Sequence, residues 1–344
     1  MSTHLRKLIA HPLFRNPPSI KRCATQLSTS TQAKIEEENL PDYDSADYLP
    51  VDIGQVFNSR QNSYTALKVY TRDTEQDENR EISIYRKIEQ LNISHPGRKY
   101  VRTMLDSFAV QGPQGSHQCL VHRPLWQNIK ASNIFSEIED ESILAEFEAA
   151  GASSPSEKVI RHDRTIYASR KLGLPQTFGP PVLCDFGAAR FGDEVNNEDI
   201  QPEVYRAPEV ILEMDWSYPV DIWNVGVMIW DLFQSKHMFD GRDPTGKYSN
   251  GFHLAEMVAC MGPPPLKFLH RSKESWNYFD KQGRLLEPTG IPASLSLESS
   301  EENLKGRRKE LFLQFMRKML QWAPEDRQSA AELLHDPWLN DEVD

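Results

Sequence analysis

The sequence contains little cysteine and no long apolar run. Its 344 residues include four cysteines, Cys23, Cys119, Cys184 and Cys260, which lie far apart and never in CxxC spacing. This pattern excludes a disulfide scaffold and a zinc ribbon, and it suits a reducing compartment. The longest uncharged apolar run, Val225–Trp230, is far shorter than a membrane span. The sequence therefore predicts no membrane partner.

Acidic side chains outnumber basic ones. Asp and Glu total 50 and Lys and Arg total 39, so the formal net charge is -11. This balance argues against direct nucleic-acid binding. The apolar fraction of 39% and the charged fraction of 26% are ordinary for a globular protein. The length predicts two domains or one large bilobal unit.

The N-terminal end differs in charge from the rest of the chain. Residues 1–34 hold six basic side chains and no Asp or Glu, and they are rich in Ser and Thr. Two interpretations stay open, a mitochondrial presequence and a basic tail, because Pro12, Pro17 and Pro18 limit any amphipathic helix. Residues 35–49 are acidic and polar, which predicts a solvated linker.

Apolar spacing places the main elements. The alternating stretch 64–70 predicts a strand and 81–91 a helix, and the short apolar stretches 119–122 and 182–184 predict two further strands. The stretch 220–233 is apolar nearly all round, which predicts a core helix. Residues 311–320 carry a helical stripe, and Ser329 with Glu332 predicts a capping box that opens a last helix over 330–335. Polar composition predicts a surface insertion over 136–158 and a loop over 285–305.

Several motifs that carry chemistry follow one another in a fixed order. Each is weak alone, but together they resemble the protein-kinase signature set over about residues 50–340. The motifs are Ala66-Leu67-Lys68, Glu81, the loop from Asn128 to Asn133, Asp185-Phe186-Gly187, Ala207-Pro208-Glu209, the helix start at Asp221 and Arg327. The resemblance implies an α+β bilobal fold. It would have a truncated, β-rich N-lobe over 50–122 and a mainly helical C-lobe over 123–340, with a surface insertion near 136–176.

The resemblance assigns a role to each motif residue, and it implies ATP and Mg²⁺ as cofactors. Lys68 would hold the ATP phosphates and Glu81 would orient Lys68. Asp185 and Asn133 would bind Mg²⁺. Lys130 would neutralise charge on the transferred phosphoryl group, and Asn128 stands at the position of the catalytic base. Glu209, Asp221 and Arg327 would be structural, with Glu209 pairing with Arg327 and Asp221 anchoring the catalytic loop.

Longer runs narrow the resemblance. The segments 182–233, 241–244, 253–265 and 315–327 resemble the SR-protein kinases, and their fungal members in particular. That family phosphorylates Ser in Arg/Ser-rich partners, often splicing factors, so the resemblance implies such partners and a role in mRNA splicing. It also implies a cytoplasmic and nuclear location, with a mitochondrial location as the alternative from residues 1–34. Between Phe186 and Tyr205 there is no Ser, Thr or Tyr. Any activity is therefore expected to be independent of phosphorylation in this segment.

Two parts of the kinase pattern are missing. Only Gly54 lies between Pro50 and Lys68, where a glycine-rich loop belongs, and about 20 residues are absent at the join after Arg60. Asn128 replaces the base Asp, and an amide cannot accept the substrate proton at neutral pH. The spacing from Lys68 to Asn128 is short by about 35–45 residues, the length of two helices.

The departures leave two functional hypotheses. One is an ATP-dependent serine/threonine kinase of the SR-protein kinase type, of which this chain is a shortened or mis-spliced form. The other is a catalytically dead pseudokinase or binding module. Both gaps have abrupt edges with a strong family match on either side, which favours skipped coding segments. The missing helices would leave apolar surface of the helix over 220–233 uncovered, so we expect low stability.

Overall fold

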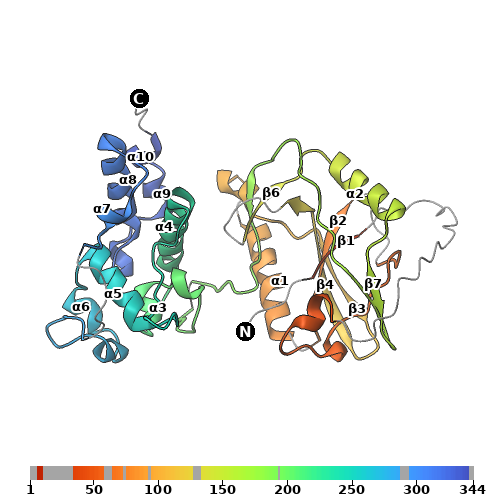
Figure 1. Cartoon of the computed structure of the whole chain (residues 1–344), viewed down its shortest axis with the longest axis horizontal. Coiled ribbons are helices and arrows are strands. Elements are labelled where there is room, and N and C mark those ends of the chain that lie inside the picture. Colours follow the sequence, from red (N-terminus) through yellow and green to blue (C-terminus); the bar gives the residue numbers. More distant parts are fainter. Residues whose placement is uncertain are drawn as a thin grey trace. The chain divides into compact units, whose positions relative to one another are not determined.

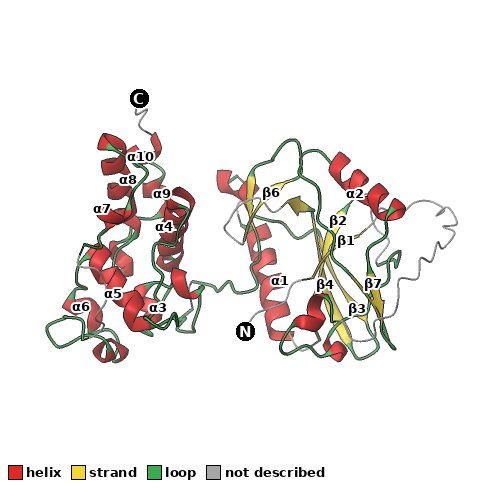
Figure 2. Ribbon diagram, viewed as in Figure 1, coloured by secondary structure: helices red, strands yellow, loops and turns green. Residues whose placement is uncertain are grey.

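The structure is a computed structural model that describes residues 6–10, 34–57, 64–72, 75–91, 94–126, 133–192, 194–286 and 294–340. The chain divides into two units with a boundary between Ala189 and Arg190. Figure 1 labels their elements and Figure 2 shows that the named strands belong to the N-terminal unit, whereas the C-terminal unit is helical. The α+β class is therefore confirmed. The predicted lobe, tail and linker boundaries stay predictions.

Four antiparallel strands form the main sheet of the N-terminal unit, in the order β1-β2-β4-β3. Helix α1 packs against this sheet through an apolar cluster of Tyr70, Ile82, Tyr85 and Leu120. The bounds are β1 Arg6–Ala10, β2 Thr65–Val69, α1 Glu75–Gln90, β3 Asp106–Gln111 and β4 Ser116–His122. The predicted strands over 64–70 and 119–122 and the predicted helix over 81–91 are thus confirmed.

A second, three-stranded sheet has the order β5-β6-β9, and a short hairpin pairs β7 with β8. Between β6 and β7 lies a helix, α2, that polar composition did not predict. Its Ile143 and Leu144 are buried, so the predicted surface insertion has an apolar side. The bounds are β5 Leu125–Trp126, β6 Ile134–Glu137, α2 Ser142–Ser153, β7 Lys158–Ile160, β8 Thr165–Tyr167 and β9 Pro181–Leu183.

The segment that precedes β2 is held to the β7–β8 hairpin, although its composition predicted a solvated linker. Two short 3-10 helices form here, Glu36–Asn39 and Ser45–Asp47. Glu38 is buried and accepts two hydrogen bonds from Arg161, at 2.8 and 2.6 Å. An acidic segment therefore packs where an arginine partner neutralises it.

The C-terminal unit is built around helices α4 and α8, which carry the largest apolar cluster of the described chain. Trp223 and Trp230 of α4 are fully buried, and Trp230 stacks on Phe312 of α8 at 6.0 Å between ring centroids. The bounds are α3 Pro208–Ile211, α4 Pro219–Gln234, α5 Asn250–Met261, α6 Leu266–Leu269, α7 Leu297–Ser300, α8 Gly306–Met319, α9 Ala330–Leu333 and α10 Pro337–Asn340.

The helices predicted over 220–233 and 311–320 and the capping box at Ser329 are confirmed. Three predictions are wrong in part. The loop over 285–305 contains α7 with buried Leu297, and α10 follows the helix predicted to be last. Helix α4 is also not buried on every side, because Val225 and Leu232 are 38% and 43% exposed.

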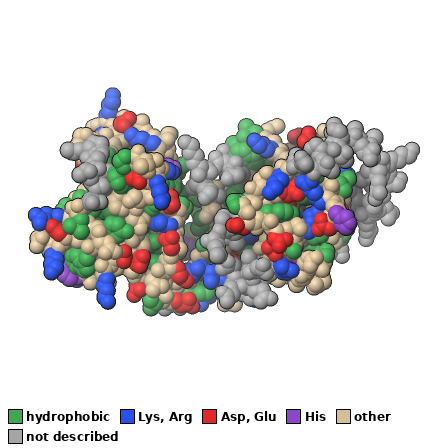
Figure 3. Space-filling view, turned by 60° about the horizontal axis from the view of Figure 1, so that its bottom comes forward, with side chains coloured by type: hydrophobic (Ala, Val, Ile, Leu, Met, Phe, Trp, Pro, Cys, Tyr) green, Lys and Arg blue, Asp and Glu red, His purple; other side chains and the backbone are tan. Residues whose placement is uncertain are grey.

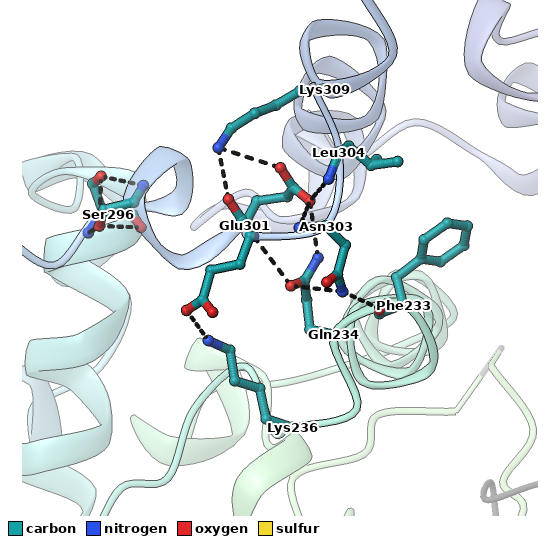
Figure 4. Close-up of polar contacts among 10 residues, drawn as sticks. Phe233, Gln234, Lys236, Ser296, Glu301, Asn303, Leu304 and Lys309 are labelled. Carbon is teal, nitrogen blue, oxygen red and sulfur yellow. Dashed lines mark hydrogen bonds and ion pairs between the residues drawn. The ribbon is translucent and has the colours of Figure 1, made fainter. Parts of the chain in front are cut away.

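A buried carboxylate fastens the end of α4 to the start of α8. Figure 4 shows Glu301 at the centre of this contact. Its Oε1 accepts hydrogen bonds from Gln234 at 3.2 Å and from the backbone amides of Asn303 and Leu304 at 2.8 and 2.6 Å. Lys309 Nζ lies 3.2 Å from Oε2. Burial alone would raise the pKa of Glu301, but these donors hold it below its ordinary value.

The described surface mixes both charge signs. Figure 3 shows acidic and basic side chains interspersed with small hydrophobic patches on the face it presents. Across the described ranges, no helix has the length and apolar character needed to cross a membrane. The described cysteines Cys119, Cys184 and Cys260 form no disulfide bond with one another.

Candidate functional site

Lys68 and Glu81 form a buried ion pair that joins strand β2 to helix α1. Residues two apart on a strand share a face, so Lys68 and Tyr70 point toward the same side of the sheet. Lys68 Nζ donates to Glu81 Oε2 at 2.5 Å, and the two side chains are 9% and 1% exposed. The sequence-predicted pair is therefore assembled in the structure.

Asp185 completes a group of three charged residues. It lies two residues after the end of β9, and its Oδ1 accepts a hydrogen bond from Lys68 Nζ at 3.3 Å. Its backbone has a φ of +64°, a conformation that costs free energy for a residue with a side chain and is concentrated at functional sites. Phe186 packs against the cluster under α1, with its ring 5.4 Å from that of Tyr85 in an edge-to-face contact.

Gly187 lets the backbone pass close to these charged groups. A Cβ atom at this position would lie 3.4 Å from Glu81 Oε2 and 3.6 Å from Asp185 Oδ1. A larger side chain would therefore fill the space beside the charged groups. Both distances are ordinary van der Waals contacts, so a Cβ alone would fit and only a longer side chain would crowd the charged groups.

Asn133 is brought next to the Asp185 segment by strand pairing. Its carbonyl accepts a hydrogen bond from Cys184 N at 2.8 Å, and the following residue, Ile134, pairs with Leu183. Carboxylate and amide oxygens suit Mg²⁺, which usually takes one or two protein ligands and completes its shell with water and phosphate oxygens. The described chain holds no cluster of three or more acidic, His or Cys ligands for a metal. Asp185 and Asn133 would supply two such oxygens, a number that suits Mg²⁺ when a nucleotide provides others.

Glu209 and Arg327 form a second buried ion pair, in the C-terminal unit. Arg327 donates to both carboxylate oxygens of Glu209 at 2.6 Å, and the two side chains are 0% and 1% exposed. The same guanidinium donates to the carbonyls of Pro219 and Gln321 and lies 5.2 Å from the ring of Trp223. The predicted Glu209–Arg327 pair is therefore present, and through Pro219 it ties α3 to the start of α4.

The remaining predicted residues are less informative. Asp221 lies in the first turn of α4, where loss of water around the carboxyl raises its pKa. Asn128 and Lys130 lie outside the described residues, so their roles and the loop that Asp221 would anchor stay predictions.

Sequence reasoning missed Tyr70, the residue after β2. Its hydroxyl donates to Glu81 Oε2, the oxygen that also accepts from Lys68. The alternation along the strand could have placed Tyr70 on the face of Lys68, but the contact depends on how α1 sits on the sheet.

A serine/threonine protein kinase of Aspergillus fumigatus is 39% identical to this chain over 386 aligned positions, covering 95% of this chain and 97% of that protein. The chain belongs to the protein kinase family. The family model described as "Protein kinase domain" matches residues 177–339. The crystal structure of the PF14_0431 kinase domain superposes with a TM-score of 0.53 at 23% identity, covering 81% of this chain and 88% of that one. The kinase fold is thereby confirmed.

The names of several relatives specify a kinase type, and two of them bear on the resemblance to SR-protein kinases. "Serine/threonine-protein kinase SRPK" of Physarum polycephalum is 22% identical over 391 positions and covers 89% of this chain and 92% of its own length. A probable serine/threonine-protein kinase, sky1, of Dictyostelium discoideum is 34% identical over 162 positions, 46% of this chain and 25% of its own. The family as a whole uses ATP and Mg²⁺ and acts on protein substrates.

The kinase of Aspergillus fumigatus also shows a difference in length. The alignment has 386 positions, whereas 95% of 344 residues is about 327. About 59 positions of that kinase therefore have no counterpart in this chain.

Proposed function

We propose that this chain derives from an ATP-dependent kinase that phosphorylates serine in Arg/Ser-rich proteins, the activity of an SR-protein kinase. The observation that supports the proposal is the group formed by Lys68, Glu81 and Asp185, in which the Lys68 ammonium lies within hydrogen-bonding distance of both carboxylates. Lys68 would bind nucleotide phosphates, and Asp185 and Asn133 would hold Mg²⁺. When bound, the metal supplies charge neutralisation on the phosphates.

Charge supports a basic substrate. The segment after Asp185 exposes Glu194, Glu198, Asp199 and Glu203. Glu198 pairs with Arg190 at 3.5 Å and Asp199 with Arg206 at 2.8 Å, both of which are arginines of this same segment. An exposed acidic segment attracts an arginine-rich peptide, because opposite charges steer and orient partners. Such a peptide would compete with Arg190 and Arg206 for Glu198 and Asp199. The likeness to proteins named SRPK and sky1 points the same way.

A second candidate, a kinase fold that binds without transferring phosphate, is favoured by the sequence around the site. Only Gly54 is available between Pro50 and Lys68, and Asn128 stands at the position of the base. The gaps expected at the two joins total about 55–65 residues. The difference of about 59 positions from the Aspergillus fumigatus kinase agrees with that total. A full-length transcript read across Arg60–Gln61 and Gln127–Asn128 would decide whether longer coding segments exist there.

The experiment compares phosphate transfer by four forms of the full chain. Each is given Mg²⁺, ATP and an Arg-Ser repeat peptide, with a Lys-Ser repeat peptide as the substrate control. We expect slow transfer by the chain as written and an increase of roughly 10²–10⁴-fold in Asn128→Asp, because a general base contributes about that factor. Lys68→Met should abolish transfer and nucleotide binding. Lys87→Met, which removes an exposed lysine of α1, should change neither.

Each outcome separates the candidates. Transfer that depends on Lys68 and prefers the Arg-Ser peptide supports the kinase proposal. Nucleotide binding that depends on Lys68, without transfer even in Asn128→Asp, supports the binding module. Binding that is indifferent to Lys68 would contradict both.

A further inference from the structure

Tyr70 contacts both members of the Lys68–Glu81 pair. Its side chain is buried, with 4% of the residue exposed. The hydroxyl donates to Glu81 Oε2, and Lys68 Nζ lies 4.9 Å from the centre of the phenol ring. One side chain therefore supplies a hydrogen bond to the Glu81 carboxylate and a cation–π contact to the Lys68 ammonium.

The direction of the hydrogen bond follows from the surroundings. Burial, followed by the negative charge of Glu81, raises the pKa of Tyr70, so the phenol keeps its proton and donates it. Glu81 is 1% exposed, and a carboxylate removed from water needs donors to remain charged. Tyr70 provides such a donor from the sheet, whereas Glu81 belongs to the helix.

Tyr70 is itself held firmly. Its backbone N donates to the Gln118 carbonyl at 2.9 Å, and its own carbonyl lies 3.0 Å from His117 Nδ1. The ring packs in the apolar cluster with Ile82, Tyr85 and Leu120. The hydroxyl therefore stands at a point fixed by β4, and it constrains where α1 can place Glu81.

We propose that Tyr70 is a positioning residue that holds Glu81 against Lys68 before any nucleotide binds. The inference rests on the proposed function, since it concerns the phosphate-binding lysine. Such a role would explain how the kinase could be active without phosphorylation of the segment that follows Asp185. The stretch between Phe186 and Tyr205 has no hydroxyl side chain to phosphorylate. An internal hydrogen bond, present in every molecule, would take the place of a phosphate in keeping the pair assembled.

The alternative is that Tyr70 merely fills space, and a matched pair of variants distinguishes the two. Tyr70→Phe keeps the ring and removes the donor. Tyr85→Phe removes a hydroxyl from the same apolar cluster, on a residue that is 1% exposed. The Tyr85 ring contacts those of His122 and Phe186, and its hydroxyl also feels the negative charge of Glu81. A space-filling role predicts similar effects for both variants, whereas a positioning role singles out Tyr70.

The readout is the reactivity of the Lys68 amine, measured without ATP. The full chain is treated with acetic anhydride in the presence of a reference amine, and the Lys68 peptide is quantified by mass spectrometry over a range of pH. Rates are taken at a temperature where circular dichroism shows every variant folded. An ion-paired ammonium reacts slowly, so freeing Lys68 from Glu81 should raise its rate.

We expect Tyr70→Phe to raise the labelling rate of Lys68 about tenfold near neutral pH. This factor is the lower end of what the loss of a hydrogen bond to a charged group implies. The lower end applies because Asp185 still pairs with Lys68. Tyr85→Phe should change the labelling rate of Lys68 less than about twofold. Glu81→Gln should raise it at least as much as Tyr70→Phe. Adding Tyr70→Phe to Glu81→Gln should then have no further effect, because Tyr70 acts through Glu81.

The proposal is overturned if Tyr70→Phe leaves Lys68 labelling unchanged, if Tyr85→Phe raises it equally, or if the two effects add in the double variant. The test requires neither nucleotide binding nor phosphate transfer. If the proposed kinase function fails, the labelling result can therefore still be interpreted. If the labelling test fails, the kinase assay likewise remains informative.

Discussion

Removing Arg327 should destabilise the C-terminal unit strongly while leaving the surface almost unchanged. In Arg327→Met the Glu209 carboxylate stays buried and loses both of its 2.6 Å hydrogen bonds. Breaking one side of a fully buried ion pair costs about 3–5 kcal/mol. The carbonyls of Pro219 and Gln321 lose a donor as well. We therefore expect a loss of about 4 kcal/mol in the free energy of unfolding.

The assay is urea unfolding of the full chain followed by tryptophan fluorescence, because Trp223 lies beneath the Arg327 guanidinium. The control is Arg271→Met. This variant breaks the Arg271–Glu325 pair, whose side chains are 34% and 55% exposed, and it should cost less than about 1 kcal/mol. Adding Glu209→Leu to Arg327→Met removes the orphaned carboxylate and should recover part of the loss. Equal losses in the Arg327 and Arg271 variants, or a double variant whose loss equals the sum of the singles, would refute the reasoning.

Three further changes test the C-terminal unit. Gly226→Val should lower the free energy of unfolding by about 1–3 kcal/mol and so lower the urea midpoint. The reason is that even a Cβ atom there would lie 3.1 Å from Leu320 and 3.2 Å from Met319. An unchanged midpoint would count against this packing. Burial, then Arg206, lowers the pKa of His253 to about 3 from its usual 6.5, so unfolding should become easier as the pH falls through that window, and His253→Gln should flatten the dependence measured by urea melts. The lowered pKa of Glu301 means that its stabilisation is present above about pH 4.5 and is lost below. The stability gap between the chain and Glu301→Gln should therefore close as acid is added, and a constant gap would contradict the assignment.

Periodicity predicted the elements whose apolar residues face one side. Helices α1 and α8 were found because their apolar residues recur at helix spacing. Strand β2 was found from its β-rich composition, since its buried residues Ala66, Leu67 and Lys68 follow one another without alternation. Helix α2 was missed because only Ile143 and Leu144 are buried within an acidic stretch, which leaves no helical stripe to detect. Composition thus describes the average of a segment, whereas packing depends on two or three of its residues.

The site was predictable where motif residues act on each other. Lys68, Glu81 and Asp185 come together as the family order implied, and Glu209 meets Arg327 across 118 residues. The contact of Tyr70 was not predictable, because it depends on the angle at which α1 rests on the sheet. The partial exposure of α4 could not be predicted from its uniformly apolar sequence. Such a sequence indicates a helix that packs in a core, but it does not show which of its sides other elements cover.

The position of the large core along the chain bears on how the protein is made. The buried members of this cluster begin at Ala207 and run to Leu333. Trp230 stacks on Phe312, which follows it by 82 residues, and Phe312 in turn contacts Trp338. During synthesis α4 therefore leaves the ribosome well before its partners exist, with both tryptophans uncovered. We expect the nascent chain to be a chaperone client until the last helices are released, and a ribosome stalled before α8 to yield insoluble protein.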